Sequence, residues 1–431
     1  MNSPFWDLNF QMVLLGSLLI GATGGLLGTF AVLRKRSLMG DALAHAALPG
    51  VAGAFLLTGS KTLPVLIAGA TATGVLGVLM IQFIVTQTRV KADAALGIVL
   101  SVFFGAGIVL LTHIQQSGVG NQSGLDKFLF GQAASIVGSD VKVMCVLAAF
   151  VMLAVVAFYK EFKALIFDPD YLASVGYNAR LIDLLLMGLI VLTVMVGLQA
   201  VGVILIAAML ITPAVSARFW TEKLGTMVTV SACLGAISGS VGTWISTLAP
   251  KIPTGPVMVL VATGCFLISA IFAPSRGVIA RLIRLQQNRN RESRLHFLRA
   301  FSELVEIGGP SEAPTIERIS KHLSEEISVT SRTAKRLARG GWLDLDGREV
   351  SLTEQGLRDA EFVLKSHRLW EHYLVHRSNI KLDHVDRPAD EVEHILTPDI
   401  VEALEKTLKE AKIDTASPQS VHATSSKGLM P

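Results

Sequence analysis

A succession of long apolar runs is the feature of this sequence that most restricts its fold. A helix needs about 20 apolar residues to cross a hydrocarbon core about 30 Å thick. Nine runs approach or exceed this length, at residues 12–33, 38–57, 63–85, 94–113, 140–158, 181–198, 201–219, 225–248 and 255–274. The turn between Gly197 and Gly202 is weakly marked, so eight spans remain an alternative. The sequence predicts an all-α polytopic membrane bundle of eight or nine transmembrane helices.

Charged residues divide the chain into two parts near residue 275. Residues 1–274 carry 14 of the 38 Lys and Arg and 10 of the 34 Asp and Glu, whereas 275–431 carry the other 24 of each. The first part is too poor in charge for a soluble domain, in which about a quarter of the residues are charged. We therefore expect a membrane domain over 1–275, a basic juxtamembrane linker helix over 276–294, and then a soluble domain.

Small residues recur at four-residue spacing in two of the apolar runs. Examples are Gly21 with Gly25 and Gly235 with Gly239. Such spacing lets the backbones of membrane helices approach closely. The runs are therefore expected to form a packed bundle.

The cations between the runs predict the orientation of the bundle. With nine spans, one side of the membrane receives Arg34 to Arg36, Arg89 with Lys91, the segment 159–180, and Arg218 with Lys223. Positively charged loops face the cytoplasm. The polar, nearly uncharged loop at 114–124 then lies outside, and the last span leads to the cytoplasm. We expect a multi-pass protein of the cell (inner) membrane, in contact with lipid, whose C-terminal domain is cytoplasmic.

Asp41 and His45 are the candidate metal ligands of the membrane part. Residues four apart share one face of a helix, so the two side chains can present an oxygen and a nitrogen to a common point. Such a pair suits Mn²⁺, Fe²⁺ or Zn²⁺, and ionisable groups inside a membrane usually face the interior of the bundle. The alternative is structural: Asp41 begins a helix whose dipole favours a carboxylate, and His45 is only packed.

Three stretches resemble one family of transporters. They are SLMGDALAHAALPGVAGAFLL (37–57), IFDPDYLASVGYNARLIDLLL (166–186) and GLQAVGVILIAAMLITPAVSARF (197–219). They are similar to the membrane subunits of manganese, zinc and iron ABC importers, over residues ~8–275. The resemblance implies a pore made with a second permease copy or a paralogue, with Asp41 and His45 contacting metal on the translocation path.

The same resemblance implies partners on both sides of the membrane. An ATP-binding cassette subunit would dock on a coupling segment whose matching positions are Phe167, Asp168, Pro169, Leu172 and Gly176. An extracytoplasmic metal-binding protein would deliver the ion. His113, at the outer end of a span, is expected to be mainly an interfacial residue.

The sequence contains no G-x-x-x-x-G-K-[ST] loop. That loop cradles the phosphates of ATP. We therefore expect no ATP site in this chain, which is a transport subunit and not an enzyme, and we expect a separate ATPase to supply the energy.

The soluble part has the order of a winged-helix domain. Helices are expected at ~293–307, ~315–326 and ~329–339, followed by two strands in WLDLDGREVSLT that join at Asp346 and Gly347, a strong hairpin signal. A long helix from Thr353 to about His376 and a last helix from Pro398 to about Ala411 follow. The predicted domain is α+β, spans 295–411 and ends in a helical dimerisation region. Residues 412–431 are rich in Ser and Thr and are expected to be disordered.

Histidines and carboxylates cluster in this soluble domain. Glu371 lies four residues beyond His367, and His394 four beyond Asp390, with Glu393 between them. These spacings allow metal chelation on a helix face, although mixed charges are also common on exposed helices. The domain contains no Cys, which favours Mn²⁺ or Fe²⁺ over a thiolate Zn²⁺ site.

In order, LHFLRAFSELVEIG, the winged helix, HRLWEHYL and DEVEHILTPDIVEALEKTL resemble the iron- and manganese-dependent repressors of the diphtheria-toxin-repressor family. The resemblance places His367 and Glu371 in one metal site, and His296, Asp390, Glu393 and His394 in another. Two positions depart from the family: Asp386 stands where some members have a His ligand, and His296 stands where Met or Asp is usual.

DNA binding by this domain stays open on the sequence alone. Arg332, Lys335, Arg336 and Arg339 line the expected recognition helix, as phosphate contact requires. Yet residues 300–431 carry 17 basic and 23 acidic residues, whereas DNA-binding domains are usually basic. The domain is thus a metal sensor acting on transport, a membrane-tethered or proteolytically released repressor, or a dimerisation module.

Together these features predict the permease subunit of an ATP-driven importer of Mn²⁺, with Fe²⁺ and Zn²⁺ as other candidate cargoes, fused to a metal-responsive domain. Two alternatives remain. One is a membrane-tethered metal-dependent transcription factor, and the other is an importer of chelated metal such as a siderophore or cobalamin.

Overall fold

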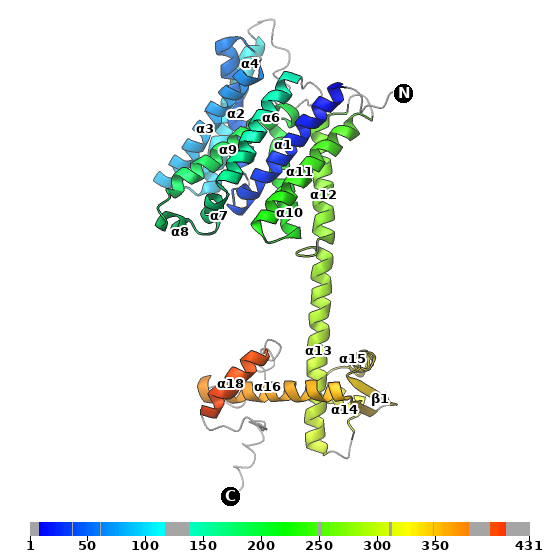
Figure 1. The fold of residues 1–431 in the computed structure, drawn as a ribbon. Coiled ribbons are helices and arrows are strands. Elements are labelled where there is room, and N and C mark those ends of the chain that lie inside the picture. Colours follow the sequence, from blue (N-terminus) through cyan, green and yellow to red (C-terminus); the bar gives the residue numbers. More distant parts are fainter. Residues whose placement is uncertain are drawn as a thin grey trace. The chain divides into compact units, whose positions relative to one another are not determined.

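The computed structural model describes residues 8–36, 38–60, 62–116, 138–248, 252–309, 313–347, 349–378 and 397–410. The chain forms two compact units, Met1–Arg281 and Leu282–Pro431. The first unit is a bundle of helices that lie side by side (Figure 1). The second combines helices with one two-stranded antiparallel sheet.

All the regular secondary structure in the described residues of the first unit is helical. Its helices are α1 (Leu8–Leu33), α2 (Met39–Thr58), α3 (Leu63–Gln87), α4 (Ala92–Gln116), α6 (Gly138–Ala157), α7 (Tyr159–Phe167), α8 (Pro169–Ser174), α9 (Ala179–Val201), α10 (Val203–Trp220), α11 (Leu224–Ser246) and α12 (Thr254–Phe272). Within the described residues, eight of them are long and apolar enough to cross a membrane, and α10 contributes a shorter apolar stretch, Leu205–Trp220. The predicted polytopic bundle is therefore confirmed.

The turn between α9 and α10 lies where the sequence marked it only weakly. Gly202 has φ +86°, a conformation that side chains with a Cβ rarely adopt. Beyond it, α10 packs against α1, α2, α9, α11 and α12, and Met209 and Leu210 are fully buried. Helix α10 is thus a central element of the bundle despite its short apolar stretch.

Helices α1 and α11 are joined by the predicted small-residue contacts. A Cβ on Gly21 would lie 2.1 Å from the carbonyl oxygen of Gly235, and one on Gly25 would lie 2.2 Å from that of Ser231. The Ser231 hydroxyl also donates a hydrogen bond of 2.6 Å to the carbonyl oxygen of Gly25. The expected close packing at both pairs of glycines is confirmed.

The second unit has the winged-helix order. Its elements are α13 (Val278–Gly308), α14 (Ile316–His322), α15 (Ile327–Arg339), β1 (Leu343–Asp346), β2 (Glu349–Leu352), α16 (Glu354–Ser378) and α18 (Pro398–Glu410). The hairpin turns at Gly347, with φ +63°, as the Asp-Gly pair predicted. Helix α14 ends earlier than expected, before Ser324, which has φ +52°. Most of the predicted basic linker, 278–294, is the first half of α13.

Two apolar clusters stabilise this unit. One joins α13, α14, α15 and the hairpin through Phe297, Ile319, Leu337 and Val350, all buried. The other joins α16 to α18 through Leu369, Val401, Leu404 and Leu408. The face of α13 that carries Phe297 is therefore fixed against the winged helix.

Candidate metal sites in the membrane and tail units

The candidate ligands of the membrane unit lie on one partly exposed stripe of α2. Asp41, His45, Pro49 and Gly53 follow one another at four-residue spacing and are half-buried, whereas most of the residues between them are buried. A Cβ on Gly53 would meet no atom within 4 Å. The stripe is the open face of a helix that is otherwise enclosed by α3, α4, α9 and α10.

Asp41 and His45 come together as their spacing predicted. Nε2 of His45 lies 3.5 Å from Oδ1 of Asp41, and the two side chains are 15% and 38% exposed. The edge-to-face contact with Phe104 of α4, 4.8 Å between ring centroids, fixes the imidazole. Its Nδ1 is buried and has no hydrogen-bond partner in the described part of the chain. Asp41 also lies in the first turn of α2, where the helix dipole favours a carboxylate.

Asp41 and His45 are not joined by a third side chain of the usual ligand types in the described part of the chain. Within the described residues, no group of three or more His, Cys, Asp or Glu side chains is placed to hold a metal ion. Transition metals in proteins usually take four or more ligands. The pair is therefore at most part of a coordination shell.

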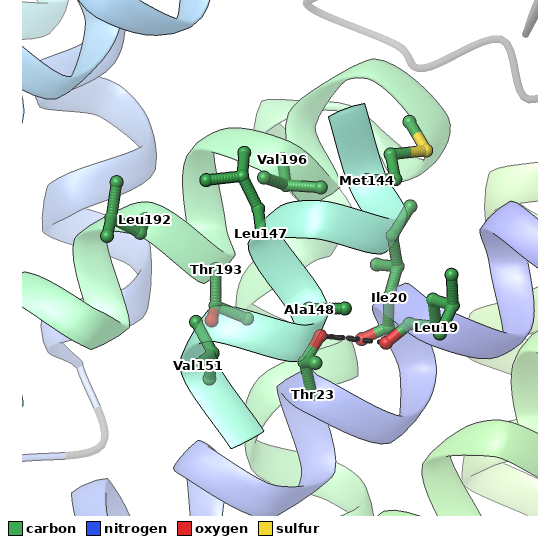
Figure 2. A pocket seen from close by; sticks show the side chains of 10 residues that line it. All are labelled: Leu19, Ile20, Thr23, Met144, Leu147, Ala148, Val151, Leu192, Thr193 and Val196. Atoms are coloured by element: carbon green, nitrogen blue, oxygen red, sulfur yellow. Dashed lines mark hydrogen bonds between the residues drawn. The ribbon is translucent and has the colours of Figure 1, made fainter. Parts of the chain in front are cut away.

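A small cavity between α1, α6 and α9 is not a site for an ion. It measures about 10 Å³, which is room for about one water molecule. Figure 2 shows its lining, which is apolar except for the hydroxyls of Thr23 and Thr193. Thr23 already donates to the carbonyl oxygen of Leu19, at 2.8 Å. The cavity offers neither carboxylate nor imidazole.

A partly buried ion network connects the end of α1 to α7 and α9. Arg34 donates to Oδ1 of Asp183 at 2.7 Å and to the carbonyl oxygen of Leu165 at 3.1 Å. Arg36 donates to Oδ2 of Asp183 at 3.0 Å. The sequence interpretation treated Arg34 and Arg36 only as topology signals and missed this role. The available signal was Asp183, a carboxylate placed inside an apolar run.

The expected coupling segment folds as two short helices. Leu172 is buried, whereas Phe167, Tyr171, Val175 and Tyr177 are exposed. The Asp168 carboxylate caps α8 by accepting from the backbone N–H of Tyr171, at 2.9 Å. Pro169 occupies the first turn of α8, and Gly176 ends the segment with φ +95°. Leu172 anchors the segment, and its aromatic side chains face outward.

In the second unit, His367 and Glu371 are also brought together. Nε2 of His367 lies 3.3 Å from Oε1 of Glu371, and the residues are 5% and 2% exposed. A third residue joins them: Nη1 of Arg299 on α13 lies 3.1 Å from Nδ1 of His367. The sequence interpretation did not assign Arg299 to this cluster. Its position three residues after His296, on the same face of α13, was the available signal.

Among the other predicted ligands, His296 lies on α13 and is half-buried. Asp386, Asp390, Glu393 and His394 lie outside the described residues. His113, at the end of α4, is exposed.

The four cations expected to contact DNA share one face of α15. Arg332, Lys335, Arg336 and Arg339 are exposed, and Ala334 and Leu337 are buried on the opposite face. Two of them have partners: Arg332 donates to the carbonyl oxygen of Ser328, and Arg336 donates to Asn290 on α13. The face is positively charged and accessible within this unit.

One ion pair joins α16 to α18. The Lys365 ammonium, hydrogen-bonded to Glu405, lowers the pKa of the Glu405 carboxyl below its usual range, with Lys409 adding to the effect. The pair lies beside the apolar α16–α18 cluster and helps to hold the two helices together.

Comparison with known proteins finds a matching family for each of the two units. The model of the ABC 3 transport family matches residues 7–273, and that of the iron dependent repressor, metal binding and dimerisation domain matches 353–419. The first match covers more than half of the chain. The protein therefore belongs to the ABC 3 transport family and carries a repressor-like domain at its C-terminal end.

Individual relatives agree with this assignment. The manganese transport system membrane protein MntC of Bacillus subtilis (strain 168) is 44% identical over 385 residues, 87% of each chain. That alignment is longer than the whole first unit, so it continues into the second. The zinc transport system membrane protein TroC of Treponema pallidum (strain Nichols) is 45% identical over 280 residues, 65% of this chain and 94% of that protein. A solved structure, PsaBC from Streptococcus pneumoniae in complex with Fab, has a TM-score of 0.58 and 32% identity over 66% of this chain and 97% of that chain.

Proposed function

We propose that this protein is the permease subunit of an ATP-driven importer of divalent transition metal ions, with Mn²⁺ as the favoured cargo. The observation that carries the proposal is the Asp41–His45 pair on the open stripe of α2. A carboxylate oxygen and an imidazole nitrogen without a thiolate suit Mn²⁺, Fe²⁺ and Zn²⁺. The relatives named for manganese and zinc support the same class of cargo.

A second permease copy completes the site in this proposal. Two donors from one chain leave the ion short of ligands, and the stripe that carries them is open. Two copies facing each other across the stripe would present two carboxylates and two imidazoles. A paralogous subunit with the same pair would serve equally well.

A separate ATP-binding cassette subunit would drive the pore through α7 and α8. Their exposed face carries Phe167 and Tyr171, a surface suited to a protein partner. Arg34 contacts both the end of α7 and Asp183, and it lies seven residues before Asp41. A movement of α7 would therefore reach the start of α2 through this network. An extracytoplasmic metal-binding protein would load the ion from the other side.

The test is uptake of radioactive Mn²⁺ by cells whose other manganese importers are deleted. Asp41→Asn removes the negative charge but keeps the shape, so uptake should fall to background while the membrane abundance of the protein is unchanged. Asp93→Asn, an exposed carboxylate in the first turn of α4, is the matched control and should transport normally. Wild-type uptake by the Asp41→Asn variant would refute the role of the pair, and uptake of only chelated metal would favour the siderophore class.

For the second unit, we propose a cytoplasmic regulatory domain that adjusts transport. The exposed cations of α15 support a second candidate, a repressor that binds DNA phosphates. The two are separated by DNA footprinting with the full chain in detergent and Mn²⁺. A footprint lost in a variant with Arg332 and Lys335 changed to Ala favours the repressor, and its absence at low salt favours regulation of transport.

A further inference from the structure

Arg299 sits where it opposes metal binding by His367 and Glu371. A guanidinium group only donates hydrogen bonds and stays charged. Because Nη1 of Arg299 lies 3.1 Å from Nδ1 of His367, Nδ1 must present its lone pair. The proton of the neutral imidazole then resides on Nε2, which lies 3.3 Å from Oε1 of Glu371.

This arrangement of protons is the reverse of what a metal requires. A histidine that ligates through Nε2 has its lone pair there and its proton on Nδ1, which donates to a neighbouring acceptor. Here that proton would meet a second donor, the Arg299 guanidinium. Ligation through Nδ1 is excluded as well, because Arg299 occupies the approach to that atom. Within the described residues, the His367–Glu371 pair therefore does not fit a metal ion.

Arg299 also places a positive charge next to the pair, through its contact with His367. Glu371 is 2% exposed, and a buried carboxylate requires a cation close by. Arg299 is held from its other side, since its Nε lies 3.5 Å from Oε1 of Glu303. Glu303 in turn accepts a hydrogen bond of 2.6 Å from Nε2 of His322 on α14. The guanidinium is thus built into a network across three helices.

We infer that Arg299 is an internal cation that takes the place of the effector metal at His367 and Glu371. The pair is then a structural ion network, and this part of the second unit holds its shape without a divalent ion. The inference concerns metal binding by the second unit and stands apart from the transport proposal.

One atom shows where a metal would enter if Arg299 were removed. Oε2 of Glu371 is buried and accepts no hydrogen bond from any described residue. Without the guanidinium, the proton of His367 could move from Nε2 to Nδ1. Nε2 and this oxygen of Glu371 would then be available as two ligands for a metal ion.

The experiment counts Mn²⁺ bound to the purified full chain by equilibrium dialysis. His367→Ala in the otherwise unchanged protein should leave the number of bound ions as it is. Arg299→Met should add about one bound Mn²⁺ per chain, and Arg299→Met with His367→Ala should remove that gain. Arg299→Lys keeps a donor-only cation and should behave as the wild type.

Two results would overturn the inference. A loss of bound Mn²⁺ in the His367→Ala variant would show that the pair already holds a metal. A folded Arg299→Met variant without any gain would show that Arg299 is not what keeps the metal out. If Arg299→Met fails to fold, the His367→Ala count and the Arg299→Lys variant still decide the question. Mn²⁺ uptake, measured in parallel, reports on the transport proposal separately.

Discussion

The Asp41–His45 and His367–Glu371 pairs have the same spacing and nearly the same separation, yet their surroundings differ. In the membrane unit, Asp41 is 38% exposed and Nδ1 of His45 has no partner among the described residues. In the second unit both residues are buried and Arg299 contacts His367. An imidazole and a carboxylate four residues apart therefore make an open pair in one place and a closed ion network in the other. The residue that closes the second pair is Arg299.

The same substitution in both pairs should have very different effects. His45→Ala should reduce Mn²⁺ uptake to background, a loss of about 100-fold or more, because half of the chain's contribution to the ion disappears. His367→Ala should leave uptake within about twofold, since the pair holds no cargo ion. Uptake assays with both variants at matched membrane abundance measure this. Equal losses of Mn²⁺ uptake in the two variants would show that the two pairs do not differ in their role in transport.

Removing Arg299 should produce the next largest effect, on stability. Arg299→Met removes the cation that contacts His367, and loss of a charged group from a buried ion network destabilises a protein by about 3 kcal/mol. The second unit of the variant should melt at a lower temperature in metal-free buffer, and added Mn²⁺ should recover part of the loss. Arg299→Met with Glu371→Gln removes the unpaired charge and is the matched control. It should be more stable than the single variant without metal.

The membrane unit has its own ion network, formed by Arg34, Arg36 and Asp183. Weakening this network should reduce transport activity more than it reduces the stability of the fold. Asp183→Asn weakens the contacts to Arg34 and Arg36 but keeps the shape of the side chain. If these contacts connect α7 to the start of α2, uptake should fall about tenfold, with ATP hydrolysis by the assembled transporter retained. Parallel measurement of uptake and hydrolysis tests this. A proportional loss of both would point to defective assembly instead.

The smallest effect belongs to the half-buried Lys365–Glu405 pair between α16 and α18. Because the folded-state pKa of Glu405 is lowered, its stabilisation is fully present above the pKa of the unfolded chain. It is lost as the pH falls through the folded pKa. Glu405→Gln should therefore weaken α18 by less than about 1 kcal/mol near pH 7 and have no effect at strongly acidic pH. Hydrogen exchange of the α18 amides at several pH values measures it.

Most of the fold could be predicted from the sequence because its signals are local. The apolar runs and Gly347 in the hairpin each determine structure within a few residues. The glycines of α1 and α11 indicated close packing, but which helices would meet was not predicted. The Asp41–His45 and His367–Glu371 contacts were predictable for the same reason, since both lie within one helical turn. Arg299 was not assigned: it shares a face of α13 with His296, but its contact with His367 forms only when α13 and α16 pack together. The contacts of Arg34 and Arg36 with Asp183 depend on a similar long-range approach.

The α1–α11 contact limits how the bundle can move. The main chains touch at Gly21 and Gly235, and again at Gly25 and Ser231. Sliding one helix along the other would drive carbonyl oxygens into side chains, because interlocked surfaces of this kind do not deform continuously. The two helices therefore travel as a rigid body. Any conformational change of the bundle must be distributed over the other helices, among them α2 with its open stripe.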